Sequence, residues 1–155
     1  MLSRREWLRS SLVGTAAVLV APRYAFAVSA PIAITVYKSP TCGCCRAWVT
    51  HLEQNGFAVK AHDLDEAALD ETKRTLSVPS ALESCHTAVV GRYAVEGHVP
   101  ADVIKKMVTE KPAILGLAVP GMPLGSPGME AGARKQPYDV IAFERGGKTR
   151  VYAKR

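Results

Sequence analysis

The chain has 155 residues and a net charge of +6, and it contains four cysteines. This length suits one ordinary domain with its own hydrophobic core. The basic residues do not cluster with interleaved aromatics, which argues against a nucleic-acid partner. The sequence also lacks a nucleophile–base set, paired carboxylates and a phosphate-binding glycine loop, which argues against a hydrolase.

The N-terminal segment predicts export from the cytoplasm. A twin-arginine pair stands at 4–5, an apolar run covers 11–21, and 25–27 has the small-x-small pattern of a signal-peptidase site. The run is shorter than the roughly 20 residues that a membrane-spanning helix needs, and an uncleaved anchor or amphipathic helix is the alternative. We therefore expect residues 1–27 to be a Tat-type signal peptide. We expect 28–155 to form a single periplasmic domain, with a net charge of +3 and no membrane contact.

The first half of this domain is predicted to alternate strands and helices. A β-branched apolar run indicates a buried strand, and a Ser-Pro-Thr break then leads into a helix that begins near the cysteines and ends before Gly56. A second strand and a second helix follow. The predicted strands cover 32–37 and 57–62, and the predicted helices cover 42–55 and 65–76.

The second half is predicted to contain two hairpins separated by a helix and an irregular segment. Strands at 87–90 and 93–96 flank a Gly-Arg turn, and Pro100 opens a helix that ends near Glu110. The stretch 115–129 is rich in glycine and proline, which predicts irregular backbone. Strands at 138–143 and 148–152 flank a Gly-Gly pair and predict a terminal hairpin.

This order of elements resembles the thioredoxin-like arrangement, an α/β fold with a βαβαββα core. In that arrangement a C-x-x-C pair lies where the first strand leads into the first helix, whose N-terminus stabilises a thiolate. Thioredoxin-fold enzymes also place a cis-proline opposite the pair, just before the hairpin. Here residues 84–87 read Ser-Cys-His-Thr, without proline. We expect Cys85 to face the other cysteines and to close a thiolate pocket.

The stretch Cys42-Gly43-Cys44-Cys45 is the most informative part of the chain. The C-x-x-C spacing of Cys42 and Cys45 allows either a disulfide or the binding of one metal ion. Cys44 adds a sulfur that dithiol exchange does not need, and three thiolates within four residues favour a soft metal. The alternatives are a redox-active Cys42–Cys45 pair with Cys44 as a bystander, and two structural disulfides in an oxidising periplasm.

Further soft donors occur later in the chain. The additional candidate metal ligands are Cys85, His98, Met122 and Met129. His98 stands between a glycine and a proline-led helix start, which holds it rigidly, and methionine thioethers on a Gly/Pro-rich loop suit Cu(I). The alternatives are a buried apolar role for Cys85, a structural role for His98 and a lid with inward-facing methionines. The remaining histidines are interpreted as surface or capping residues: His51, His62 and His86.

Four motifs follow one another along the chain: Tyr-Lys-Ser-Pro-Thr-Cys-Gly-Cys-Cys at 37–45, Gly-His-Val-Pro-Ala at 97–101, Gly-Leu-Ala-Val-Pro-Gly-Met-Pro at 116–123 and Gly-Ser-Pro-Gly-Met-Glu at 125–130. Together they resemble the bacterial periplasmic copper-resistance family of CopG type, which is distinct from the plasmid repressor of the same name. The resemblance covers nearly all of the mature chain.

The resemblance implies a thioredoxin-like protein that binds copper, as Cu(I) and as one ion or several. Cys42, Cys44 and Cys45 correspond directly to the family's C-x-C-C sulfurs. The resemblance also assigns ligand roles by motif to Cys85, His98, Met122 and Met129. It implies a role in copper resistance, with storage, sequestration, delivery and redox interconversion of copper all open. Partners would be copper ions and other periplasmic copper-handling or redox proteins.

Two other functions remain as rivals, and metal binding is favoured over enzymatic catalysis. The first is a periplasmic thiol-disulfide oxidoreductase with Cys42 as the attacking thiol and Cys45 as the resolving thiol. The second is an iron–sulfur protein, because four cysteines can ligate a cluster.

Overall fold

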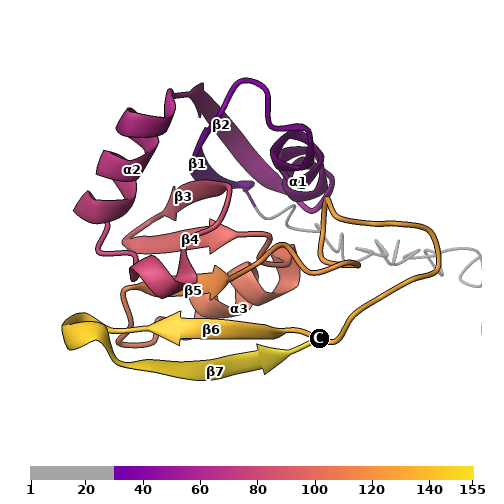
Figure 1. Cartoon of the computed structure of the whole chain (residues 1–155). Helices are drawn as coiled ribbons and strands as arrows, with labels where there is room; N and C mark the ends of the chain where they lie inside the picture. The colour runs from indigo at the N-terminus through magenta and orange to yellow at the C-terminus, as the bar shows by residue number, and fades with distance from the viewer. Residues whose placement is uncertain (1–29) are drawn as a thin grey trace, which may run out of the picture.

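The computed structural model describes residues 30–155. Within this range, seven strands form one mixed sheet and three α-helices cover it (Figure 1). The strands lie in the order β2-β1-β3-β4-β5-β6-β7. The predicted α/β class is confirmed, whereas the predicted signal peptide at 1–27 lies outside the described residues. None of the described helices is long and apolar enough to cross a membrane.

The helices and strands follow the predicted order with small changes at their ends. The elements are β1 (Ile32–Lys38), α1 (Gly43–Gln54), β2 (Phe57–Asp63), α2 (Glu66–Thr75), β3 (His86–Val90), β4 (Tyr93–Gly97), α3 (Ala101–Glu110), β5 (Gly116–Val119), β6 (Asp139–Phe143) and β7 (Thr149–Lys154). Two short 3-10 helices lie at Ser80–Leu82 and Arg145–Gly147.

The segment predicted to be wholly irregular contains a buried strand, β5. This strand pairs in parallel with β4 and antiparallel with β6, so it joins the predicted terminal hairpin to the rest of the sheet. Gly116 makes this pairing possible. A Cβ atom at this position would lie 2.2 Å from the carbonyl oxygen of Ala94 and 2.6 Å from Cζ of Phe143. The glycine that suggested a turn is therefore a site of close packing between strands.

The helix starts show how local sequence sets the elements. Asp65 caps α2, because its Oδ1 accepts a hydrogen bond of 2.8 Å from the backbone N–H of Ala68. The N-cap of α3 is Pro100, which has no side-chain group to offer. Instead, Nε2 of His51 on α1 accepts a hydrogen bond of 3.2 Å from the N–H of Ala101. This contact ties the start of α3 to α1.

Apolar side chains pack on both faces of the sheet. Helices α1 and α3 cover one face, and α2 with the following turn covers the other (Figure 1). The first face includes Trp48, Leu52, Ile104, Met107 and Leu117, and the second includes Leu76, Val78, Ala94, Ala118 and Phe143. Leu117 and Ala118 lie on opposite faces because side chains alternate along a strand.

Strand pairing brings three chain segments together at one end of the sheet. Strand β1 ends where β3 begins, and the antiparallel register places Lys38 opposite His86. Strand β4 ends beside the start of β3, with Thr87 opposite Glu96. Trp48 adds a tie from α1, because its Nε1–H donates a hydrogen bond of 2.9 Å to the carbonyl of Val99. The loops after β1, before β3 and after β4 therefore meet beside the first turn of α1.

Candidate metal centre

The first turn of α1 carries three of the four cysteines. Cys42 is the N-cap, and its Sγ accepts a hydrogen bond of 3.3 Å from the N–H of Cys45. Cys42 and Cys45 are joined by a disulfide, while Cys44 and Cys85 are free thiols. The helix N-terminus stabilises negative charge on sulfur at this position. The site is therefore in its oxidised form, with two thiols available.

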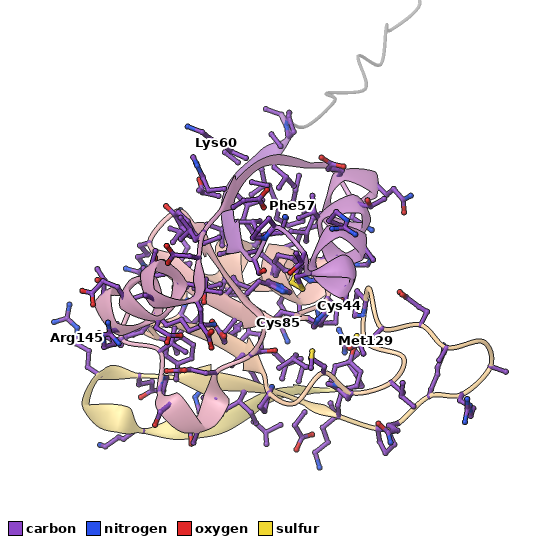
Figure 2. The ribbon with its side chains drawn as sticks, turned by 45° about the horizontal axis from the view of Figure 1, so that its top comes forward. Cys44, Phe57, Lys60, Cys85, Met129 and Arg145 are labelled. Carbon is purple, nitrogen blue, oxygen red and sulfur yellow. A yellow bond between two sulfur atoms is a disulfide. The ribbon has the colours of Figure 1, made fainter. Side chains whose placement is uncertain are left out.

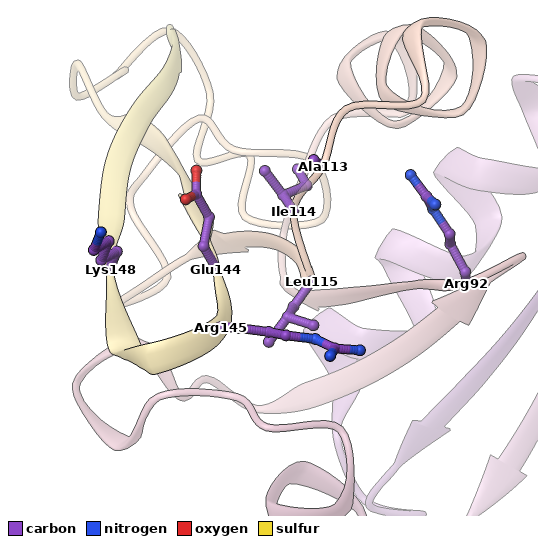
Figure 3. A pocket seen from close by; sticks show the side chains of 7 residues that line it. All are labelled: Arg92, Ala113, Ile114, Leu115, Glu144, Arg145 and Lys148. Atoms are coloured by element: carbon purple, nitrogen blue, oxygen red, sulfur yellow. The ribbon is translucent and has the colours of Figure 1, made fainter.

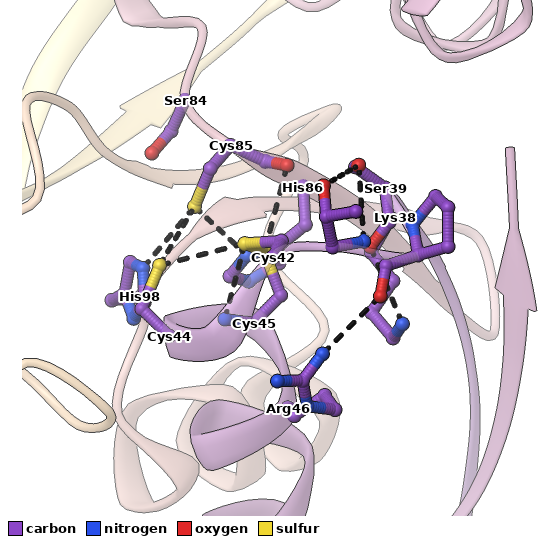
Figure 4. Close-up of a disulfide and its surroundings, with 12 residues drawn as sticks. Lys38, Ser39, Cys42, Cys44, Cys45, Arg46, Ser84, Cys85, His86 and His98 are labelled. Carbon is purple, nitrogen blue, oxygen red and sulfur yellow. Dashed lines mark hydrogen bonds between the residues drawn. A yellow bond between two sulfur atoms is a disulfide. The ribbon is translucent and has the colours of Figure 1, made fainter. Parts of the chain in front are cut away.

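The four sulfur atoms form one group, as predicted from the sequence. Cys44 Sγ lies 3.5 Å from Cys42 Sγ and 3.8 Å from Cys85 Sγ (Figure 4). All four sulfurs lie within 4.8 Å of one another. Cys85 comes from the loop before β3, some forty residues from the others in the chain, and it faces them without a cis-proline, since residues 30–155 contain no cis peptide bond.

Two histidines extend this group on the side of Cys85. Nε2 of His98 lies 3.3 Å from Cys85 Sγ, and Nδ1 of His86 lies 3.4 Å from the same sulfur. The carbonyl oxygen of Pro127 lies 2.7 Å from Nδ1 of His98, so this nitrogen carries the proton and donates. Nε2 of His98 is then left with a lone pair directed at Cys85. A second hydrogen bond that fixes the tautomer is the usual arrangement of a metal-ligating histidine.

His86 was interpreted from the sequence as a solvent-facing or capping residue, and this interpretation is wrong. Its side chain is fully buried and lies against Trp48 and His98, with ring centroids 4.3 Å and 5.0 Å away. Its Nε2 is buried and makes no hydrogen bond of acceptable geometry. His86 is thus a further candidate ligand. Its position next to Cys85 was the one sequence signal for a ligand role. Sequence adjacency alone does not show that the side chains of Cys85 and His86 both face the site.

Burial favours the neutral forms of Cys85, His86 and His98. It lowers the pKa of His86 well below the ordinary value, helped by the nearby His98 and Lys73 and weakly opposed by the backbone of Gly97. Burial also lowers the pKa of His98, against the opposing effects of Pro127 and Glu130. It raises the pKa of Cys85 to about 12, and Cys44 adds to this shift. Near neutral pH both imidazoles are unprotonated, while the Cys85 thiol holds its proton.

The loop of the GSPGME motif covers the site. A Cβ atom on Gly128 would lie 2.8 Å from both the carbonyl oxygen of Cys44 and the backbone nitrogen of Trp48, and 3.3 Å from Nδ1 of His98. Gly128 also has a φ of +85°, which disfavours other residues. The loop therefore packs directly against α1 and His98, and only glycine permits this approach.

The two methionines predicted as ligands differ in position. Met129 follows Gly128 and is half-buried on the side of the molecule that carries Cys44 and Cys85 (Figure 2). Met122 is 41% exposed and has a φ of +49°. The structure therefore brings together four cysteines and two histidines, carries Met129 on the covering loop, and leaves Met122 partly exposed to solvent.

An open cavity elsewhere has the wrong chemistry for a soft metal. Its volume is about 500 Å³. It lies at the opposite end of the sheet from the cysteines, as the positions of Arg145, Cys44 and Cys85 in Figure 2 show, and Figure 3 shows its lining side chains. Its lining consists of Arg92, Ala113, Ile114, Leu115, Glu144, Arg145 and Lys148. These residues supply no sulfur or imidazole. The metal centre is therefore identified by its converging donors and not by the volume of a cavity.

The donor set fits a soft or borderline metal ion. Two groups of potential ligands share Cys85: the four cysteines, and Cys85 with His86 and His98. Thiolates select ions such as Cu(I), and imidazole suits copper in general. Nδ1 of His86, 3.4 Å from Cys85 Sγ, is the ring nitrogen that faces the shared sulfur.

Comparison with known proteins agrees with this chemistry. Residues 82–129 match a family described as "Protein of unknown function, DUF411". No curated protein matches the chain. A solved structure titled "Copper resistance protein copG- Form 2" is 47% identical, and Form 1 is 46% identical. Each has a TM-score of 0.75, and each match covers 81% of this chain and 98% of the solved one.

This chain belongs to the CopG copper-resistance family. The family predicted from the four sequence motifs is thereby confirmed. The family-model match begins just before Cys85 and ends at Met129, so it includes Cys85, both buried histidines and the covering loop.

Proposed function

We propose that this CopG-family protein binds copper in the periplasm, holds it as Cu(I) in a thiolate cluster and contributes to copper resistance. Family membership and the cysteine cluster support copper handling. The observation that carries the finer proposal is the convergence of four sulfur atoms within 4.8 Å of one another. Cu(I) is the copper ion that such soft ligands select.

Copper binding is coupled to reduction of the disulfide. In the oxidised form, Cys42 and Cys45 are bonded to each other and cannot act as thiolate ligands. Two electrons and two protons, delivered by a dithiol reductant, convert this pair into thiols. The reduced site then offers four sulfurs, and each thiol that becomes a ligand releases a proton.

The two donor groups suit more than one copper ion. Cys85 belongs to both groups, and a thiolate sulfur can bridge two ions. The cysteine side favours Cu(I), whereas His86 and His98 accept copper in either oxidation state. We propose that both histidines bind copper, and that Met129 supports the site from the covering loop. Interconversion of the copper oxidation state is compatible with this arrangement of ligands.

The cellular location and fold family are part of the same proposal. The twin-arginine pattern at 4–5 and the small-x-small pattern at 25–27 support Tat export, with residues 28–155 as the mature protein. The order of elements from β1 to α3, with the cysteines at the start of α1, supports a thioredoxin-like core. Partners in the periplasm would be copper ions and proteins that supply or remove copper or electrons.

One observation favours a second function. The Cys42–Cys45 disulfide at a helix N-terminus is the arrangement that a thiol-disulfide oxidoreductase uses. However, Cys44 lies 3.5 Å from Cys42 Sγ and competes as an internal thiol. Dithiol exchange also gives no role to the two buried histidines beside Cys85. Their position there favours the metal-binding proposal.

The deciding experiment measures metal content and thiol chemistry on the same protein. Untagged mature protein from copper-grown cells is analysed for copper, zinc and iron, and reduced protein is titrated with Cu(I) against a chromophoric chelator. We expect copper in the isolated protein, tight Cu(I) binding by the reduced protein, and weaker binding of fewer copper ions when the disulfide is left intact. Protein that contains zinc or iron but no copper, or that reduces disulfide substrates after Cys44→Ser and Cys85→Ser substitution, would overturn the proposal.

A further inference from the structure

A buried ion pair lies directly behind the Cys85 loop. Lys73 on α2 and Glu96 on β4 form a salt bridge, and their side chains are only 3% and 0% exposed. Charged side chains are rarely buried to this degree, because removing them from water is costly. Replacing such a pair with apolar residues is often neutral or favourable for stability. The pair therefore needs an explanation other than the stability of the fold.

The pair binds the backbone and side chains on both sides of Cys85-His86. Lys73 Nζ donates hydrogen bonds of 2.9 Å to the carbonyl of Ser84 and 3.0 Å to Oγ1 of Thr87. Glu96 Oε1 accepts a hydrogen bond of 2.6 Å from the N–H of Ser84, and Oε2 accepts one from the Thr87 hydroxyl. Glu96 thus accepts from three donors, which is the pattern of an ionised carboxylate.

These bonds hold the two residues that flank the candidate ligands. Ser84 precedes Cys85 and Thr87 follows His86, so both ends of a two-residue segment are fixed to the same ion pair. Gly97 adds a steric limit, because a Cβ atom there would lie 2.8 Å from Cβ of Ser84 and 2.6 Å from the carbonyl of Val119. The segment is therefore held by polar contacts and close packing together.

We propose that Lys73 and Glu96 are positioning residues that hold Cys85 and His86 in place for metal binding. This inference rests on the copper-binding function proposed above. The ion pair makes no hydrogen bond to a ligand atom; it acts by fixing the backbone of Ser84 on one side of the ligands and the side chain of Thr87 on the other. In metal sites, residues that orient the ligands contribute about 10- to 100-fold in affinity.

The test separates positioning from stability by using a double variant. Lys73→Met alone leaves the Glu96 carboxylate buried without its cation, and loss of stability is expected. Lys73→Met together with Glu96→Leu leaves no unpaired buried charge, so it should fold and lose less in thermal midpoint than Lys73→Met alone, although Ser84 and Thr87 lose hydrogen-bond partners. We expect this double variant to bind Cu(I) about 10- to 100-fold more weakly. The matched control is Arg74→Met with Glu71→Leu, an exposed pair on the same helix that should leave affinity unchanged.

A second readout is independent of copper. With the disulfide intact, Cys44 and Cys85 are the free thiols in the described region, and alkylation by iodoacetamide can be assigned to each by peptide mass spectrometry. We expect the double variant to change the alkylation rate of Cys85 several-fold and that of Cys44 much less. A change at Cys85 in a stably folded variant reports an altered environment of this thiol, through its access to reagent or its thiolate fraction, in the absence of copper.

The outcomes distinguish this inference from the function on which it rests. If reduced wild-type protein does not bind Cu(I), the proposed function fails. If the wild type binds and the folded double variant binds equally well, with unchanged Cys85 alkylation, the positioning role is wrong. A double variant that does not fold would assign the ion pair to stability and would also overturn the positioning role.

Discussion

The two ends of the sheet present opposite chemistry. Where β1 and β4 end, Cys85, His86 and His98 are packed together with the sulfurs of α1 and are largely removed from water. Where β4 and β5 begin, the exposed side chains of Arg92 and Arg145 line an open cavity. The first end has many converging donors. The second has volume and charge, but its groups are hydrated and do not converge.

This difference shows why donor geometry identifies the metal centre better than cavity size. A metal ion needs a few ligand atoms at short mutual distances, with their protons displaced and their orientation fixed. Burial at the sulfur end keeps the imidazoles unprotonated and excludes competing water. At the other end, three cationic side chains and one carboxylate line the cavity, and this net positive charge disfavours a metal cation. The predictions below test this contrast.

The largest effect is expected from Cys85→Ser. Cys85 Sγ lies 3.8 Å from Cys44 Sγ, 3.4 Å from Nδ1 of His86 and 3.3 Å from Nε2 of His98. Because this sulfur belongs to both groups of potential ligands, the substitution removes an atom from each group. We expect Cu(I) affinity to fall by more than the roughly 100-fold typical of a residue that only orients ligands. The measurement is competition with a chromophoric Cu(I) chelator. Arg145→Ala at the other end is the control, and an equal loss in both variants would refute the contrast.

A smaller effect is expected from the glycine that brings the covering loop to the site. Gly128→Ala places a Cβ atom 2.8 Å from backbone atoms of Cys44 and Trp48, and its φ is positive. Gly121→Ala is a matched control, because Gly121 also has a positive φ but has no atom within 4 Å of the added Cβ. Both should lose about 1–2 kcal/mol from backbone strain, and Gly128→Ala should lose about 1–3 kcal/mol more from overpacking.

Chemical denaturation measures these stabilities, and Cu(I) competition measures the consequence for the site. Affinity should fall in Gly128→Ala and remain at the wild-type value in Gly121→Ala. Equal stability losses in the two variants would show that the loop does not press on α1.

The most gradual effect is the dependence of metal-free stability on pH. Because the pKa values of His86 and His98 are lowered on folding, the unfolded chain binds more protons below their ordinary value of 6.5. Stability should therefore fall as the pH drops below 6.5, by at most about 1.4 kcal/mol per pH unit for each histidine.

At alkaline pH, the dependence of stability on pH comes from Cys85, whose pKa is raised from 9.0 to about 12. Above pH 9 the unfolded chain loses this proton while the folded chain keeps it, so stability should fall as the pH rises. Denaturation of the metal-free protein across pH 5 to 10 should give a maximum between these limits. A profile that is flat below pH 6.5 would contradict burial of the two histidines as neutral groups.

Much of the fold and most of the candidate ligands were predicted from the sequence, and His86 was the converging residue that was missed. Periodicity, caps and breaks predicted the three helices and six of the seven strands of the described region, because these signals act over a few residues. The strand missed was β5, where Gly116 resembles a loop signal but serves close packing against Ala94 and Phe143. That distinction depends on residues more than twenty positions away on either side.

The chemistry of Cys42, Cys44 and Cys45 was determined by the sequence, since three sulfurs in four residues are close in any fold. Tertiary structure decided the rest of the centre. Antiparallel pairing of β3 with β1 and β4 brings Cys85 and His98 together and turns His86 inward. It also buries Lys73 against Glu96, two charges that no local pattern pairs. Long-range strand register, which short-range signals do not encode, sets these contacts.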